Sequence, residues 1–110
     1  MYTFSGVVYY PLDPHPNEIN VEDIAHALSM LCRYAGHTKR FYSVAEHSVL
    51  VSHMVPPELA LEALLHDATE AYLCDVVRPL KVALPDYKAI EELNDMAVRI
   101  RFKLPPYEHP

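Results

Sequence analysis

The chain of 110 residues is 51% apolar and carries 9 Lys and Arg against 15 Asp and Glu, for a formal net charge of −6. This length allows one domain with its own core, and two Gly against ten Pro are typical of a helical protein whose joints are marked by proline. The acidic excess and the lack of a dense Lys/Arg cluster exclude a basic face for duplex nucleic acid, but they allow a single nucleotide as partner.

Location and redox state follow from two further features. No apolar run reaches the roughly 18 residues that a membrane-spanning helix needs, and the first residues lack the basic and apolar regions of a signal peptide. We therefore expect a cytoplasmic protein with no membrane partner. Cys32 and Cys74 form no C-x-x-C unit, so we expect two reduced thiols in or near the core.

Residues 1–19 are predicted to form an N-terminal arm. Residues 7–10, Val-Val-Tyr-Tyr, are prone to extended structure. Three prolines then interrupt any regular element: Pro11, Pro14 and Pro16. The pattern predicts a short strand or an extended segment, followed by a turn.

The first helix is predicted to begin after Asn20, a suitable N-cap with Asp23 three residues later. Apolar residues then repeat at helical spacing: Val21, Ile24, Leu28, Leu31 and Cys32. Gly36 stands where a C-cap belongs, so the helix should reach the residue before it. Three polar residues fall on the opposite face, where they should face water or line a cleft: His26, Ser29 and Arg33.

The second helix has a clear start signal. Ser43 and Glu46 match the N-cap and N3 positions of a capping box. Helical spacing places four residues on the buried face: His47, Leu50, Val51 and Met54. Pro56-Pro57 ends this helix, and Pro57 can serve as the first residue of the third.

The third helix is predicted to contain residues 61–75. Its apolar stripe is formed by Leu61, Leu64, Leu65, Ala68, Ala71 and Tyr72. In a regular helix Glu70 lies one turn beyond both His66 and Asp67, so an imidazole and two carboxylates can converge beside the core.

After a loop from Asp75 to Pro85, a fourth helix is predicted over about residues 86–103. Its inward residues should be Tyr87, Ile90, Leu93, Ala97 and Ile100, and its outward charges Glu91, Glu92, Arg99 and Arg101. Pro105-Pro106 should stop it. Four helices with short joints predict an all-α fold, a compact helical array that forms a single domain over residues 1–110, with a helical core at 20–106.

His47, His66 and Asp67 are the candidate metal ligands. Two imidazoles and one carboxylate suit Mn, Fe, Co, Ni or Zn and, less well, Mg. Such side chains beside an apolar stripe are costly to desolvate unless something pairs with them, and a divalent ion would do so. On spacing alone, the alternative is that the histidines are core residues satisfied by hydrogen bonds.

Several linked segments carry a wider resemblance. They are Arg33, residues 43–48 (Ser-Val-Ala-Glu-His-Ser), residues 66–70 (His-Asp-Ala-Thr-Glu) and residues 75–81 (Asp-Val-Val-Arg-Pro-Leu-Lys). Together they resemble the HD-domain metal-dependent phosphohydrolases, and more narrowly the branch of 5′-deoxynucleotidases and phage dNTP triphosphohydrolases. The resemblance covers nearly the whole chain, from about Phe4 to Pro106.

The resemblance implies an all-α HD domain with a metal centre. The positions of His47, His66 and Asp67 bind a catalytic divalent ion in such enzymes, which lowers the pKa of a bound water and polarises the phosphoryl oxygen. Glu70 matches a carboxylate that transfers a proton or orients the water, so Glu70 and Asp67 are the expected catalytic residues.

The resemblance also implies three substrate-binding residues. Arg33 and Lys81 match basic positions that contact phosphate, and Asp75 matches a residue near the sugar or a second metal. The alternatives are that Arg33 and Lys81 are ordinary solvated charges and that Asp75 is a turn residue at a helix end.

The sequence departs from the family pattern at its last helix. HD enzymes complete the metal site with a second Asp on a later helix, whereas this sequence stops at Pro110 and offers only Asp86 and Asp95 on the predicted fourth helix. We expect a domain truncated before its C-terminal helix, or a short form that uses Asp95, water or a neighbouring subunit's carboxylate. The missing helix should leave an apolar face uncovered, which favours a homo-oligomer.

Two functions are compatible with these observations. The first is an enzyme in which metal-activated water attacks a phosphate ester or anhydride of a nucleotide, with a deoxynucleotide favoured. The alternative is a truncated or degenerate HD domain that binds nucleotide or self-associates without turnover. The identity of the nucleotide, the choice of mono- or triphosphate and the identity of the ion stay open.

Overall fold

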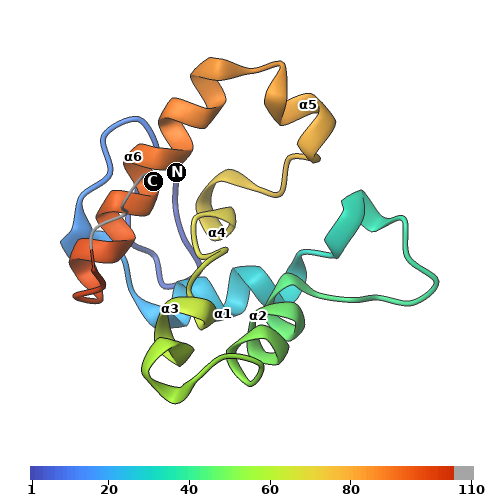
Figure 1. The fold of residues 1–110 in the computed structure, drawn as a ribbon. Helices are drawn as coiled ribbons and strands as arrows, with labels where there is room; N and C mark the ends of the chain where they lie inside the picture. Colours follow the sequence, from blue (N-terminus) through green and yellow to red (C-terminus); the bar gives the residue numbers. More distant parts are fainter. Residues whose placement is uncertain (106–110) are drawn as a thin grey trace.

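The computed structural model of the chain describes residues 1–105 (Figure 1). These residues form six α-helices and three short 3-10 segments, and their only β pairing is two isolated bridges, Tyr2 with Val8 and Cys32 with Ser43. The predicted all-α class is confirmed. The Cα radius of gyration of 13.8 Å is close to the about 13 Å of a compact chain of this length. Within residues 1–105, no helix combines the length and apolarity needed to span a bilayer.

The N-terminal arm is not one extended segment, because an antiparallel bridge between Tyr2 and Val8 folds its first residues back on themselves, and it is part of the core. It contains one 3-10 turn, η1 (Pro16–Glu18), which packs against α6 (Pro85–Arg101). Tyr9 is fully buried and stacks on Tyr72, with ring centroids 4.0 Å apart. The hydroxyl of Tyr9 donates to the side-chain oxygen of Asn94 on α6. The arm therefore joins α6 to the rest of the domain.

The first helix, α1 (Val21–Met30), begins as predicted, because the side chain of Asn20 accepts a hydrogen bond of 2.8 Å from the backbone N–H of Asp23. It ends at Met30 and not at Gly36, which corrects the predicted boundary. Leu31 is extended, and its carbonyl accepts a backbone hydrogen bond of 2.8 Å from Val44. Pairing with the segment before the second helix therefore ends α1 one full turn early.

The second helix, α2 (Val44–Ser52), begins at the predicted cap, where the Ser43 side chain accepts a 3.0 Å hydrogen bond from the backbone N–H of Glu46. Its buried face was predicted wrongly. Val44 and Ser48 are buried, whereas Leu50 is 48% and Met54 81% exposed. The helix has apolar residues on most sides, so its packing against α1 and α3 selects the buried face, and no single stripe does.

The predicted third helix is broken into three pieces. They are η3 (Pro57–Leu59), α3 (Ala60–Leu64) and α4 (Glu70–Leu73). Between α3 and α4, residues 65–69 form tight turns in which backbone N–H groups donate to carbonyls three residues back, as from Ala68 to Leu65 at 3.1 Å. His66 and Asp67 therefore lie on turns and not on a regular helix, although Ala68 and Tyr72 are buried as predicted.

The predicted loop after Asp75 contains a short helix, α5 (Arg78–Val82). Pro79 lies in its first turn, where proline is compatible with a helix. The last helix, α6, has nearly the predicted bounds, but it ends at Arg101. Its buried residues are Asn94, Ala97 and Val98, while the predicted inward residues Leu93 and Ile100 are 48% and 63% exposed.

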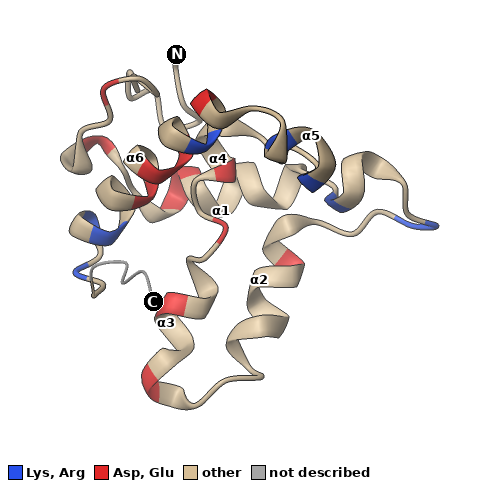
Figure 2. Ribbon diagram, turned by 45° about the horizontal axis from the view of Figure 1, so that its top comes forward, with Lys and Arg blue, Asp and Glu red and all other residues tan. Residues whose placement is uncertain are grey.

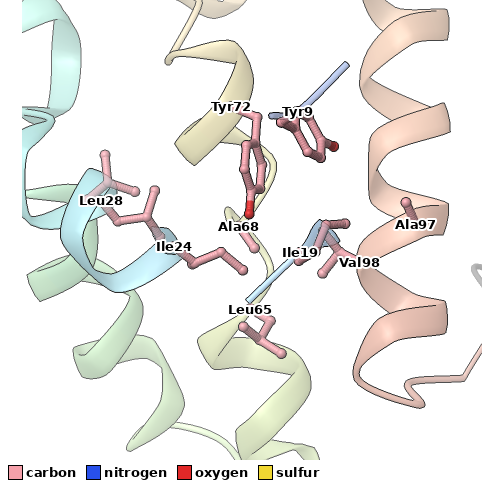
Figure 3. Packing of buried hydrophobic residues seen from close by; sticks show 10 residues of the cluster. Tyr9, Ile19, Ile24, Leu28, Leu65, Ala68, Tyr72, Ala97 and Val98 are labelled. Carbon is pink, nitrogen blue, oxygen red and sulfur yellow. The ribbon is translucent and has the colours of Figure 1, made fainter. Parts of the chain in front are cut away.

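The core lies between α1, α4 and α6, with arm residues filling the space beside α6 (Figure 3). Its members are Tyr9, Ile19, Ile24, Leu28, Val44, Leu65, Ala68, Tyr72, Ala97 and Val98. Both cysteines are free, as expected, and Cys32 is partly buried. Cys74 is exposed, so the expectation of a near-core thiol was wrong there, because α4 ends at that residue and turns its side chain outward.

Candidate metal centre

His47, His66 and Asp67 come together from two parts of the chain. His47 lies on α2, and the other two lie on the turns that follow α3, the helix that packs against α2. One donor atom from each side chain lies within 4.8 Å of the others. The two imidazole centroids are 5.5 Å apart, with their planes inclined by 65°. The convergence predicted from the sequence is present, although the predicted regular helix is not.

The orientation of His66 is fixed from both sides. Its Nδ1 lies 2.6 Å from the carbonyl oxygen of Ala63, and its Nε2 lies 3.0 Å from Oδ2 of Asp67. A backbone carbonyl that holds Nδ1–H leaves Nε2 as the nitrogen available to a metal, which is the usual outer-sphere support of histidine ligands. The side chains of His66 and Asp67 are 38% and 27% exposed, so solvent reaches this pair.

The two histidines have opposite pKa shifts. Burial lowers the pKa of His47, and the nearby positive charge of Arg33 lowers it further. The hydrogen bond to Asp67 raises the pKa of His66, and the Ala63 carbonyl adds to this effect. Burial acts to raise the pKa of Asp67, but hydrogen bonds from His66 and Glu70 outweigh it and lower the pKa overall. The centre thus combines an imidazole whose neutral form is favoured with an imidazole whose protonated form is favoured by a neighbouring carboxylate.

Glu70, the first residue of α4, is held beside Asp67. Burial raises the pKa of Glu70 to about 9, and a hydrogen bond to Asp67 together with the charges of Asp67 and Asp75 adds to the rise. At neutral pH its carboxyl group therefore keeps a proton and donates it to Asp67. A protonated acid next to a carboxylate is an arrangement suited to proton transfer.

The three donors fit a divalent ion. Donor atoms that each lie about 2.1 Å from one ion are separated by about 3 to 4.2 Å, so shifts of roughly 1 Å would bring this set into coordination distance. Two imidazoles and one carboxylate are also a donor set that transition metals accept. Two of the three donors, His66 and Asp67, line the cleft described below.

The predicted substrate-binding residues lie near this centre, and all three are partly exposed. Arg33 is the first residue of η2 (Arg33–Gly36), and its positive charge acts to lower the pKa of both His47 and His66. Lys81 lies on α5 and pairs with Glu91 of α6 at 3.0 Å. Asp75 follows α4, and its negative charge raises the pKa of Glu70. All three lie near the centre, while their roles toward a substrate stay predictions.

A cleft of about 650 Å³ opens beside the centre. Its walls come from the α3–α4 turns, α5 and α6: His66, Asp67, Thr69, Glu70, Lys81, Lys88, Glu91, Glu92, Asp95, Met96 and Arg99. Figure 2 shows that α6 carries acidic residues along this region and that α5 carries basic ones. His47, Arg33 and Asp75 are not among the residues that line it.

The α6 wall of the cleft was not predicted from the sequence. Arg99 was expected to point outward, but its side chain is only 13% exposed and pairs at 3.0 Å with both Glu62 and Asp95. The sequence does contain a pattern that indicates this wall, because five of its charged residues recur at helical spacing and so share one side of α6. They are Lys88, Glu91, Glu92, Asp95 and Arg99. Asp95, one of the two candidates for a fourth ligand, thus lines the same cleft as His66.

Comparison with known proteins yields relatives without an assigned activity. No protein-family model matches the chain. Over 104 residues it is 53% identical to the uncharacterized protein YfdR of Escherichia coli K12, an alignment that covers 94% of this chain and 58% of that protein. Over 104 residues it is 41% identical to an uncharacterized protein of Rhodobacter capsulatus, covering 86% of this chain and 53% of the other. The chain spans a little more than half the length of these relatives. Because their names assign no activity, a functional proposal depends on the geometry of the site.

Proposed function

We propose that the chain is an HD-type metal-dependent phosphohydrolase that acts on nucleotides, with deoxynucleotides favoured. The observation that carries this proposal is the convergence of donor atoms from His47, His66 and Asp67 within 4.8 Å. The His47 … His66-Asp67 spacing of the HD phosphohydrolases supports the family assignment, which is part of the proposal. The partly open cleft of about 650 Å³ beside the centre is large enough for a nucleotide-sized ligand.

The chain's own residues divide the chemistry among them. His47, His66 and Asp67 hold the divalent ion, which when bound activates water and polarises a phosphoryl oxygen. Glu70 holds a proton on its carboxyl group and donates it in a hydrogen bond to the ionised Asp67. In the reaction Glu70 would pass this proton to the leaving oxygen and take one from the attacking water. The hydrogen bond between the two carboxyl groups keeps this proton next to the metal centre.

The cations near the centre stabilise the phosphate. The charge of Arg33 acts to lower the pKa of both histidines, and the charge of Lys81 acts to lower that of Glu70. Each cation is therefore near enough to offset negative charge that develops on a transferring phosphoryl group. Lys81 is held by Glu91 at 3.0 Å, which keeps its ammonium group at the cleft. Asp75, next to Glu70, supports the raised pKa of that carboxyl group.

A metal and substrate panel tests the proposal. The protein is loaded in turn with Mn, Co, Zn, Ni, Fe or Mg and incubated with deoxynucleoside mono- and triphosphates, and release of phosphate or pyrophosphate-containing products is measured. We expect turnover that is lost in His66→Ala and Asp67→Ala. His53→Ala is the matched control, because this exposed histidine caps α2 outside the centre and should leave turnover unchanged. Turnover no higher than that of His66→Ala with every ion would refute the proposal.

A second candidate function, a binding or self-associating module without turnover, has one observation in its favour. Three apolar side chains on one side of α6 are between 48% and 63% exposed: Leu93, Met96 and Ile100. Exposed apolar side chains on one helix face favour association. Concentration-dependent sedimentation together with nucleotide binding, in the absence of turnover, would support this module.

A further inference from the structure

Backbone pairing between two segments places Arg33 near the metal centre. Cys32 and Ser43 form an antiparallel bridge, and the N–H of Arg33 donates to the carbonyl of Tyr42 at 2.8 Å. The Val44 N–H bonds to Leu31 at 2.8 Å on the other side of the bridge. The segments 31–33 and 42–44 therefore run side by side directly before α2, the helix that carries His47.

Two aromatic rings lie against the guanidinium group of Arg33. Its Cζ is 4.6 Å from the ring centroid of Tyr34 and 5.4 Å from that of Tyr42, both within the range of cation–π attraction. Among residues 1–105 its side chain has no ion pair with a carboxylate. Aromatic rings interact with the face of a guanidinium and leave its N–H edge open, which is the edge that binds phosphate oxygens.

We propose that Tyr42 is a positioning residue: its ring, with that of Tyr34, holds the Arg33 guanidinium beside the metal centre with its N–H edge open to an oxyanion of the substrate. This inference rests on the proposed function, because it deepens the description of how the same site binds phosphate. It adds a residue that neither the sequence pattern nor the cleft lining indicates.

Tyr34 has the closer ring, at 4.6 Å against 5.4 Å from the Arg33 Cζ, but Tyr42 is the less exposed of the two. Tyr34 is the sequence neighbour of Arg33 and is 56% exposed, with a left-handed backbone at φ 57°. The Tyr42 backbone is tied to Arg33 by a hydrogen bond, so the pairing of the two segments keeps the residue that carries this ring next to Arg33. Removal of the Tyr42 ring should release the guanidinium to solvent.

Arg40 offers a matched control on the same ring. Its Cζ lies 5.5 Å from the Tyr42 centroid, a distance nearly equal to that of Arg33. Unlike Arg33, it pairs with a carboxylate, Glu46, at 3.1 Å, and its side chain is 69% exposed. Arg40 is also not among the charges that shift the pKa of His47 or His66. Loss of Arg40 therefore removes a cation from the ring without removing one from the metal centre.

The experiment measures binding of inorganic phosphate, the simplest oxyanion probe, to the Mn²⁺-loaded chain by equilibrium dialysis. Mn²⁺ affinity is measured first for each variant. Tyr42→Leu should weaken phosphate binding about 3- to 10-fold, as the loss of a cation–π contact predicts, with Mn²⁺ affinity unchanged. Tyr42→Phe, which keeps the ring, and Arg40→Gln should both stay within about twofold of the wild type. Arg33→Ala should show the largest loss.

The outcomes separate this inference from the proposed function. If the wild type binds none of the six ions, Mn, Co, Zn, Ni, Fe and Mg, the proposed function fails, and the positioning role fails with it; if it binds another of them and not Mn²⁺, the same variants are compared with that ion. If it binds Mn²⁺ and phosphate but Tyr42→Leu binds phosphate equally well, only the positioning role is overturned. Weakening by Arg40→Gln as large as that by Tyr42→Leu, or no rescue by phenylalanine, also overturns it. If leucine lowers the unfolding midpoint markedly, Arg33→Lys is tested instead, because lysine keeps the charge but not the stacked, forked geometry.

Discussion

Asn94, on α6 beside the N-terminal arm, finds its hydrogen-bond partners within the chain, whereas the side chains of the metal centre mainly face one another. Asn94 is fully buried, accepts from Tyr9 and donates to the carbonyls of Pro11 and Ile90 at 2.9 and 2.8 Å. In contrast, His66 and Asp67 are partly exposed and bond to each other.

This difference separates polar groups that stabilise the fold from those that are available for chemistry. A buried amide with every hydrogen bond made resists rearrangement, because each lost partner costs desolvation energy. A partly exposed imidazole and carboxylate whose facing atoms bond to each other can exchange that bond for a shared cation at small cost, while the Ala63 carbonyl still holds the other side of the His66 ring. The predictions below test this contrast, first at the arm and the metal centre and then at weaker contacts of each region.

The largest effect is expected from the arm. Tyr9→Ala removes a fully buried ring that stacks on Tyr72 at 4.0 Å and leaves a cavity, so the free energy of unfolding should fall by about 3 to 5 kcal/mol. Denaturant unfolding measures this loss. Tyr10→Ala, at a side chain that is 54% exposed, should change stability by no more than about 0.5 kcal/mol. Equal losses in the two variants would show that the arm is not part of the core.

The next largest effect on stability is expected from ion binding at the metal centre. An ion that binds only the folded chain stabilises it, by about 2.7 kcal/mol when its free concentration is a hundred times its Kd. Added Mn²⁺ should therefore raise the Tm and EDTA should reverse the rise. His66→Ala should abolish the response and His53→Ala should keep it. A Tm that responds equally in both variants would mean that the ion binds elsewhere.

Asp23 gives a pH-dependent effect in the arm region. Burial acts to raise its pKa, but hydrogen bonds from Thr3, Ser5 and Asn20 outweigh this effect and lower the pKa below its ordinary value. A carboxylate whose pKa is lowered by folding stabilises the protein above its ordinary pKa of about 3.9 and loses that contribution as the pH falls through the lower, folded value.

Asp23→Asn should therefore cost about 2 kcal/mol at pH 7, because several donors lose their charged acceptor. The cost should shrink as the pH is lowered below about 4. Denaturant unfolding between pH 7 and pH 2.5 measures it, with the exposed Glu22→Gln as control. A cost that does not change with pH would exclude the charge of Asp23 as its source.

The smallest effect is expected at the start of α2. Ser43→Ala removes the side chain that caps this helix at 3.0 Å, so the free energy of unfolding should fall by about 1 kcal/mol. Because His47 follows one turn later, Mn²⁺ affinity should also fall slightly, which calorimetry can measure. Ser29→Ala on α1, where the hydroxyl is exposed and bonds to the His26 carbonyl, is the control and should leave both values unchanged.

Features that depend on a few neighbouring residues were predictable from the sequence. Asn20 and Ser43 cap α1 and α2 as expected, because a cap needs only its own side chain and an N–H group three residues later. The all-α class follows from helical spacing in the same way. The convergence of His47 with His66 and Asp67 was predictable because the pattern places them on adjacent apolar segments.

Features that depend on distant segments were not predictable. Residues 65–69 have helical spacing and no helix breaker, yet they form turns between α3, which packs against α2, and α4, which packs against α1. Arg99 faces inward because Glu62, 37 residues earlier, comes to meet it. The support of His66 by the Ala63 carbonyl uses a backbone atom, which no side-chain pattern reveals.

The central claim is that His47, His66 and Asp67 share one cation, and a crystal structure of the Mn²⁺-soaked protein tests it most directly. Data collected near the manganese absorption edge should show one strong anomalous peak within about 2 to 2.5 Å of Nε2 of His66, a ring nitrogen of His47 and a carboxylate oxygen of Asp67. Anomalous density elsewhere with none among these three side chains, at a Mn²⁺ concentration that saturates the protein in solution, would contradict the claim.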